Sequence, residues 1–164
     1  MKKLSLATYF ADIARYTSAS EEYGGDFLRF FAMTLYRLEK DDACEALIKS
    51  VFELRTAAML GFMPDLRACG RCVCYEHSEM FFLFGESTIV CGDCFDGNRD
   101  DEGVFTLSPS LLYTLRYVVY SPVEKLFGFS LAGVTAEQFY SFTEKYLLGH
   151  LNRSFRSLEY YYKV

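Results

Sequence analysis

The chain has 164 residues, enough for one domain of ordinary size with a small additional module. Its hydrophobic content of 51% argues against disorder, and its net charge of −5 argues against strong, non-specific nucleic-acid binding. No stretch approaches the roughly 20 apolar residues of a membrane span. The apolar stretch after Met1 is too short and polar for a secretion signal. We therefore expect a cytoplasmic protein that does not contact membranes.

Three helices are predicted in the first 66 residues, where apolar side chains recur every three or four positions. The first ends in a loop over residues 17–25. Asp26 is the predicted N-cap of the second, and the third follows a turn at residues 40–42 and ends at Gly61, a suitable C-terminal cap. The expected buried positions are Leu4, Leu6, Tyr9, Phe10 and Ile13, then Phe27, Phe30, Phe31, Leu35 and Leu38, then Cys44, Leu47, Val51, Leu54 and Ala58.

Two Cys-x-x-Cys motifs follow, and they are the strongest chemical signal in the chain. Their cysteines are Cys69, Cys72, Cys91 and Cys94. Four thiolates in two tight turns form the tetrahedral, all-sulfur cage that Zn²⁺ adopts in structural sites. Cys74 is a fifth sulfur beside the first motif, and the matched pairs make it the spare. Because four cysteines close the coordination shell, we expect one structural zinc ion per chain.

Residues 80–84 and 87–90 predict a short β-hairpin between the two motifs, and the acidic stretch 96–103 is expected to be a solvated linker. Ser108 then caps a helix that has Pro109 in its first turn and stops before Pro122. A capping box at Thr135–Gln138 opens a last long helix. The expected buried positions are Leu111, Leu112, Leu115, Val118 and Val119 in the former helix, and Phe139, Phe142, Tyr146 and Leu147 in the latter.

The predicted fold is mainly α. A helical domain, formed by residues 1–66 and 103–164, carries an inserted four-cysteine, zinc-ribbon-like β-hairpin module with its linker over residues 67–102. The 16 phenylalanines and 13 tyrosines are expected to pack the helical core; an aromatic stacking surface is the alternative.

Catalysis has one candidate. His77 and Glu79 before the second motif match part of the H-x-E…P-C-x-x-C signature of zinc deaminases. Val90 replaces the proline of that signature, and the first motif is then left unexplained. His77 could also replace a cysteine ligand, although an exposed loop residue is the simpler interpretation. His150 is expected to be a packing or surface residue. We expect no enzymatic activity, with a zinc-dependent hydrolase or deaminase as an alternative.

Basic residues gather near the C-terminus, and a solvated helix face is the simplest interpretation. If the cluster has a function, it would bind phosphates or an acidic peptide. The candidate nucleic-acid contacts are Lys2, Lys3, Arg153, Arg156 and Lys163.

The order of these features resembles the C-terminal part of RecO, a family of bacterial recombination mediators. The resemblance runs from about Leu4 to Leu158 and is most specific over Phe52–Cys72, with the pattern F-E-L-x(5)-L-G-x-x-P-x-L-x-x-C-x-x-C. It implies an α-helical domain with a four-cysteine zinc finger, and the two motifs supply the matching ligands.

The resemblance also implies a non-enzymatic role in recombinational DNA repair at the nucleoid. RecO proteins bind the C-terminal tail of single-stranded-DNA-binding protein, associate with RecR, promote annealing and help to load RecA. Much of their DNA contact comes from an N-terminal OB-fold, and nothing before Leu4 could form one, so the resemblance leaves open whether these residues bind DNA alone. A generic zinc-stabilised adaptor is the alternative.

A receptor for an acidic tail with an apolar end needs a hydrophobic groove rimmed by a cation. The third helix offers Arg55 beside Leu54, Met59 and Leu60. We expect the tail to bind there.

Overall fold

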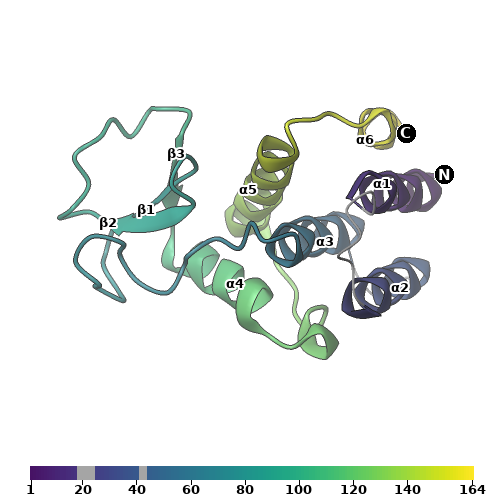
Figure 1. Cartoon of the computed structure of the whole chain (residues 1–164), viewed down its shortest axis with the longest axis horizontal. Coiled ribbons are helices and arrows are strands. Elements are labelled where there is room, and N and C mark those ends of the chain that lie inside the picture. Colours follow the sequence, from purple (N-terminus) through teal and green to yellow (C-terminus); the bar gives the residue numbers. More distant parts are fainter. Residues whose placement is uncertain (18–24, 41–43) are drawn as a thin grey trace.

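The computed structural model describes residues 1–17, 25–40 and 44–164 (Figure 1). The predicted loop after the first helix, at residues 18–24, and residues 41 and 42 of the predicted turn lie outside the described residues. The cysteine motifs and a small sheet lie at one end of the molecule, and both chain termini lie at the other (Figure 1).

Six α-helices and one 3-10 helix make up the helical part that is described. They are α1 (Lys2–Thr17), α2 (Gly25–Glu39), α3 (Glu45–Met59), α4 (Pro109–Tyr120), η1 (Val123–Lys125), α5 (Gly133–Leu151) and α6 (Arg156–Tyr161). Helix α3 lies in the centre, with α1 and α2 on one side and α4 and α5 on the other, and α6 packs against α1 (Figure 1).

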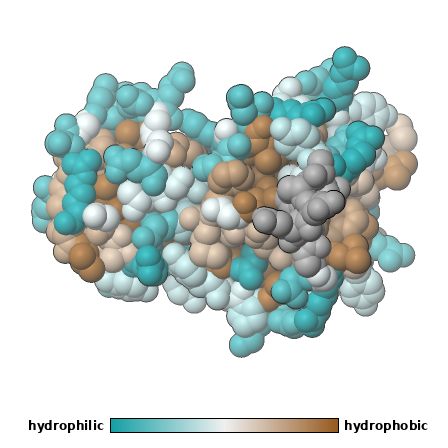
Figure 2. All heavy atoms as spheres, in the orientation of Figure 1, coloured by the Kyte–Doolittle hydropathy of each residue, from teal (hydrophilic) through white to brown (hydrophobic). Residues whose placement is uncertain are grey.

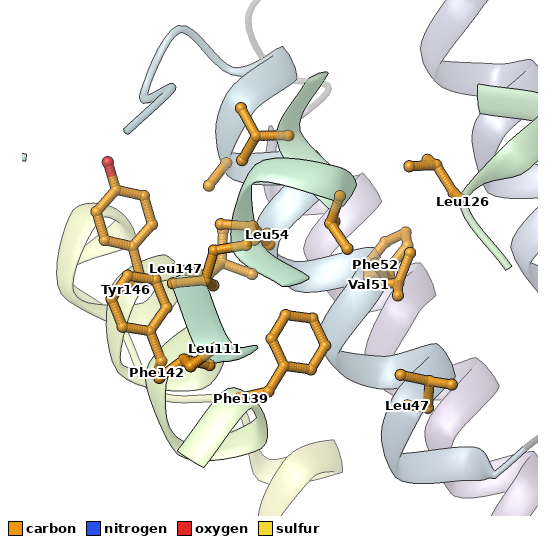
Figure 3. Close-up of a cluster of buried hydrophobic side chains, with 14 of the residues drawn as sticks. Leu47, Val51, Phe52, Leu54, Leu111, Leu126, Phe139, Phe142, Tyr146 and Leu147 are labelled. Carbon is orange, nitrogen blue, oxygen red and sulfur yellow. The ribbon is translucent and has the colours of Figure 1, made fainter. Parts of the chain in front are cut away.

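Helix α3 is central because it is buried around most of its circumference. Its apolar side chains Val51, Phe52 and Leu54 have no exposed surface. They meet Phe139 and Leu147 of α5 in one cluster (Figure 3). A helix that is apolar on more than one face is stable only when neighbours cover all of it. Gly61 follows α3 with a φ of +90°, which confirms the predicted C-terminal cap.

Two charged residues of α3 are buried in the same core. Lys49 Nζ lies 2.9 Å from Glu53 Oε1 and 2.6 Å from Glu144 Oε2 on α5. Glu53 also accepts hydrogen bonds from Tyr9 Oη and Thr143 Oγ1, at 2.9 and 3.0 Å. We name Lys49, Glu53, Glu144, Tyr9 and Thr143 the buried polar cluster. It ties α1, α3 and α5 together, and buried charges are tolerated only with partners of this kind.

The sheet has three antiparallel strands in the order β2-β1-β3: β1 (Met80–Leu83), β2 (Thr88–Cys91) and β3 (Val104–Leu107). Strands β1 and β2 form the predicted hairpin, whereas no strand was predicted at β3. Cys91 pairs with Met80 in the sheet, and this register fixes the start of the second cysteine motif. We name residues 67–107 the cysteine module.

Aromatic rings join the cysteine module to α5. The Phe82 ring lies 4.9 Å from Phe142 and 5.6 Å from Tyr146, both measured between centroids in edge-on geometry. Phe84 lies 5.4 Å from Phe142. Tyr146 Oη also donates to the carbonyl of Phe62 at 3.0 Å. The sheet and the helices therefore share one continuous core, and the module has a fixed position on α4 and α5.

Several local predictions were wrong. Leu4 is 72% exposed, because it faces away from the core in the first turn of α1. Cys44 is exposed and precedes the first turn of α3, so it is not a core residue. Helix α5 begins at Gly133, with Ala132 as an N-cap that lacks a side-chain hydrogen bond, and the predicted capping box is not its start. Helix α6 is separate from α5 and was not predicted.

Asp26 lies inside α2, which begins at Gly25, so it is not the predicted N-cap, and Phe31 and Leu35 are only partly buried. The signals at the start of α4 are confirmed. Ser108 Oγ accepts a hydrogen bond from the Leu111 N–H at 3.2 Å, and Pro109 stands in the first turn of α4. All predicted apolar positions of α4 and α5 are buried. Within the described part of the chain, no helix combines the length and the apolar character that a membrane crossing requires. Figure 2 shows hydrophobic and hydrophilic residues interspersed over the face that it displays.

Candidate metal centre

The first cysteine motif forms a tight turn against strand β2. The Cys69 N–H donates to the Cys74 carbonyl at 2.8 Å, and the Val73 N–H donates to the Cys69 carbonyl at 2.9 Å. Gly70 donates to the Ile89 carbonyl of β2 at 2.8 Å. A Cβ atom on Gly70 would lie 3.0 Å from the Thr88 hydroxyl oxygen, so a larger residue there would press on the Thr88 side chain.

The second motif is a similar turn that begins at the end of β2. Gly92 donates to the Glu79 carbonyl at 2.9 Å, and a Cβ atom on Gly92 would lie 3.0 Å from the His77 ring. The Cys94 N–H donates to the Cys91 carbonyl at 3.1 Å. In each motif the glycine after the first cysteine packs closely on side chains of a neighbouring segment, Thr88 beside Gly70 and His77 and Glu79 beside Gly92.

The two turns bring the four predicted cysteine sulfurs together. The Sγ atoms of Cys69, Cys72, Cys91 and Cys94 all lie within 4.8 Å of one another, and Cys72 Sγ lies 3.6 Å from Cys91 Sγ. Tetrahedral zinc with bonds of about 2.3 Å would hold its sulfurs about 3.8 Å apart. The four thiols fit a tetrahedral metal ion, and this group can hold one.

The environment of Cys69 favours its thiolate. Burial opposes ionisation, but the backbone N–H groups of Cys91, Cys72 and Arg71 outweigh it and lower the pKa of Cys69 to about 6. One of these contacts, from the Cys91 N–H to Cys69 Sγ, measures 3.4 Å. Hydrogen bonds with Cys72 and Cys91 raise the pKa of Cys94 to about 12, because crowded thiols share their protons. A dication among them would favour all four thiolates.

Side chains next to the cysteines tie the two turns together. Arg71 donates to the Cys94 carbonyl at 3.3 Å and forms an ion pair with Asp96 at 3.1 Å. His77 Nε2 lies 3.4 Å from Asp93 Oδ2 in the other turn. The contacts of Arg71 and His77 thus connect the two turns that carry the cysteines. They could not be predicted from the sequence, because the partners are about 20 residues apart in the chain.

The alternative ligands lie outside the sulfur cluster. Cys74 Sγ donates to the Glu76 carbonyl at 2.9 Å, and His77 Nδ1 lies 2.9 Å from the Glu79 carbonyl. The Glu79 carboxylate forms a bidentate ion pair with Arg99, at 2.8 and 3.0 Å. This ion pair holds the pKa of Glu79 below its usual value. A deaminase site needs a histidine ligand and a free glutamate, and this geometry supplies neither.

The predicted tail-binding residues lie at the end of α3. Leu54 is fully buried, so it cannot contact a partner directly, whereas Met59 and Leu60 are half-buried. Arg55 donates through Nη1 to the carbonyls of Val118 and Val119, at the end of α4. Burial lowers the pKa of Arg55, and its buried Nε has no hydrogen-bond partner within the described structure.

The predicted nucleic-acid contacts lie on α1, on α6 and beside them. Lys3 Nζ donates to the Glu39 carbonyl at 3.0 Å, and the Arg153 guanidinium lies 4.7 Å from the Tyr16 ring centroid. Lys2, Arg156 and Lys163 are exposed. These cations lie at the end of the molecule opposite the cysteine module (Figure 1).

Comparison with known proteins identifies the family. The profile described as Recombination protein O C terminal matches residues 1–159. The chain belongs to the RecO family. It is 24% identical over 160 residues to the DNA repair protein RecO of Acetivibrio thermocellus, covering 98% of this chain and 62% of that protein. It is also 24% identical over 164 residues to RecO of Caldanaerobacter subterraneus subsp. tengcongensis, covering 100% of this chain and 65% of that protein.

A shorter RecO match has higher identity. RecO of Caldicellulosiruptor saccharolyticus is 31% identical over 78 residues, which are 48% of this chain and 32% of that protein. The chain thus spans just under two thirds of the length of the first two relatives. The resemblance seen in the motifs is confirmed over nearly the whole chain, and it is to the C-terminal part of RecO.

Proposed function

We propose that the chain is the non-enzymatic, partner-binding part of a RecO-type recombination mediator. The observation that carries this proposal is the match of the RecO C-terminal family to residues 1–159. Its expected partners are the acidic tail of single-stranded-DNA-binding protein and RecR, and it would support annealing and RecA loading at the nucleoid in the cytoplasm. DNA contact through an OB-fold would come from residues outside this chain.

We further propose that the metal is one structural Zn²⁺, held by the sulfur atoms of Cys69, Cys72, Cys91 and Cys94. Four thiolates leave no coordination position for water, so the ion has no route to hydrolytic chemistry. Its effect is on folding: each motif contributes two ligands, and the ion joins the loop after α3 to the end of β2. The small sheet of the cysteine module then keeps its position beside α4 and α5.

The proposed tail site comprises Arg55, Met59 and Leu60 at the end of α3. Leu54 is omitted because its side chain has no exposed surface. The unpartnered Nε–H of Arg55 supports this placement. A small local movement that admits a carboxylate would give that donor a charge-assisted hydrogen bond. Met59 and Leu60 would contact the apolar end of the peptide.

Calorimetry with the acidic C-terminal tail peptide tests this function. We expect saturable binding to the folded, zinc-loaded chain, and loss of binding when the terminal apolar residue of the peptide is removed. Arg55→Glu should weaken binding strongly, whereas Arg29→Glu, at an exposed position of α2, is the charge-matched control. Absence of binding by a folded, metal-loaded sample would contradict the proposed partner. Tail binding that survives Arg55→Glu would contradict only the placement.

A further inference from the structure

The four clustered cysteines differ in their access to solvent. Cys69 and Cys91 are buried, with exposed fractions of only 2% and 1%. Cys94 is half-buried, whereas Cys72 is exposed. Cys72 directly precedes Val73, which is 77% exposed at the tip of the first cysteine turn. A small reagent in solution therefore meets Cys72 before it meets any other member of the cluster.

A buried sulfur lies directly beside this exposed cysteine. Cys72 Sγ is 3.6 Å from Cys91 Sγ, although 19 residues separate the two along the chain. Cys91 is held in place, because it pairs with Met80 in the sheet and its carbonyl accepts from the Cys94 and Phe95 N–H groups, at 3.1 and 3.0 Å. The two sulfurs need to approach by roughly 1.5 Å to form a disulfide bond of about 2.05 Å. The exposed and the buried cysteine thus form a pair that can be oxidised together.

The fifth sulfur of this region does not compete for that partner. Cys74 is only two residues from Cys72, but its Sγ donates to the Glu76 carbonyl at 2.9 Å and lies outside the sulfur cluster. Cys74 is also partly covered, since it packs against the hydrophobic core. We therefore expect Cys74 to remain a free thiol when Cys72 is oxidised.

A bond between Cys72 and Cys91 would join the same two turns that the proposed zinc ion joins. It would leave two thiolates, which is half of the ligand set of a structural zinc site, so the ion would be lost. The small sheet has a second anchor, because the Phe82 and Phe84 rings lie 4.9 and 5.4 Å from Phe142 of α5. The cysteine module can therefore exchange its metal for a disulfide and keep its position on the helices.

We propose that the cysteine module is a reversible oxidation site, at which a hydroperoxide converts the thiolates of Cys72 and Cys91 to a disulfide with release of the zinc ion. Cys72 is the sulfur that reacts with the oxidant, because it is exposed, and Cys91 is the sulfur that resolves the product. This inference rests on the proposed zinc site and adds a response to oxidants that a purely structural metal does not have.

The reaction balances with hydrogen peroxide as the two-electron oxidant. The Cys72 thiolate attacks one peroxide oxygen, the O–O bond breaks and hydroxide leaves, so that Cys72 becomes a sulfenic acid. The Cys91 thiolate then attacks the Cys72 sulfur, the S–S bond forms, the S–O bond breaks and a second hydroxide leaves. Each hydroxide takes up a proton from solvent. Two thiolates, one peroxide and two protons thus give one disulfide and two water molecules.

Peptide mapping after treatment of the zinc-loaded chain with excess hydrogen peroxide tests the proposal. A chromogenic chelator records zinc release, and alkylation then blocks the remaining thiols. Cleavage after arginine and glutamate places Cys69 in peptide 68–71, Cys72 in peptide 72–76 and Cys91 in peptide 87–99. We expect one zinc released for each disulfide formed, and peptide 72–76 cross-linked to peptide 87–99. Dithiothreitol with added zinc should restore the starting zinc content.

Three variants assign the reacting sulfurs. Cys74→Ser is the matched control and should keep both the zinc release and the cross-link. Cys94→Ser retains the two reacting sulfurs, so it should form the same cross-link even without bound zinc. Cys91→Ser removes the resolving sulfur, so Cys72 should advance to sulfinic acid, which dithiothreitol does not reverse.

Several results would overturn the proposal. They are a disulfide within one motif, between Cys69 and Cys72 or between Cys91 and Cys94, a cross-link that Cys74→Ser abolishes, sulfinic acid at Cys72 in the parent, and four thiols that persist under peroxide. A purified chain without zinc would contradict the proposed metal instead, and the same mapping of that chain would still decide the disulfide. None of these results tests tail binding at Arg55.

Discussion

Replacing Lys49 by methionine tests the buried polar cluster most sharply. Methionine keeps the length of the side chain but removes an ammonium group that is 2.9 Å from Glu53 and 2.6 Å from Glu144. Glu53 is fully buried and would keep only the hydroxyl donors of Tyr9 and Thr143. Breaking a buried pair in this way costs about 3–5 kcal/mol when the remaining charge has no other partner.

The expected loss is smaller here, because Glu53 can take up a proton. Burial already raises the pKa of Glu53 above its ordinary 4.5, and Lys49 opposes this rise. Without Lys49 the pKa rises further, so the folded protein binds more protons than the unfolded chain above pH 4.5 and loses stability as the pH increases. We expect Lys49→Met to cost about 2–3 kcal/mol at neutral pH and less at pH values near 5.

Urea denaturation followed by far-ultraviolet circular dichroism, at pH 5 and pH 8, measures this loss. Lys125→Met, at an exposed position of η1, is the matched control and should stay within about 0.5 kcal/mol of the parent. The double variant Lys49→Met with Glu53→Gln removes both charges and should recover part of the stability. A Lys49→Met protein as stable as the control at both pH values, or one that loses more at pH 5, would show that Lys49 does not stabilise the buried Glu53 carboxylate.

Three further outcomes follow from the metal centre and from α3. Cys94→Ser should remove the bound zinc measured by elemental analysis, whereas Cys74→Ser should retain one equivalent; loss in both would show that Cys74 is a ligand. Gly70→Ala should cost about 1–3 kcal/mol in chemical denaturation, because its Cβ would lie 3.0 Å from the Thr88 hydroxyl, and a neutral result would contradict this close approach. Arg55→Met removes donors to the last carbonyls of α4 and should lower the free energy of unfolding by about 1–3 kcal/mol; unchanged stability would show that these bonds contribute little.

Local sequence signals predicted those parts of the fold that depend only on residues close together in the chain. The Ser108 cap, the glycine after α3 and the paired cysteines each need only a few neighbouring residues to be recognised. Apolar periodicity located the helices for the same reason. The four clustered cysteines could be predicted because each Cys-x-x-Cys turn brings its own two sulfurs close together before any tertiary contact forms.

Features that depend on distant partners were missed. Strand β3 is short and only Leu107 in it is buried, so its identity comes from pairing with β1, more than 20 residues earlier. Cys44 fitted the helical period, but it precedes α3 and faces solvent. The buried position of Lys49 was not predicted, since nothing near it in the sequence shows that Glu144 will lie beside it.

The composition also did not predict that most phenylalanines are buried while several tyrosines are exposed. Phenylalanine and tyrosine occur at similar frequency, and both suit a core. The structure buries most phenylalanines and leaves Tyr75, Tyr113 and Tyr120 exposed around α4. The hydroxyl group explains the difference, since a buried tyrosine such as Tyr146 needs a hydrogen-bond partner, here the carbonyl of Phe62.

X-ray absorption at the zinc edge, combined with elemental analysis of the purified chain, measures whether the two cysteine turns hold one closed, structural zinc ion. We expect one zinc per chain with four sulfur neighbours at about 2.3 Å and no lighter atom in the coordination shell. A nitrogen or oxygen neighbour in that shell, or a folded chain that carries no zinc, would contradict this expectation.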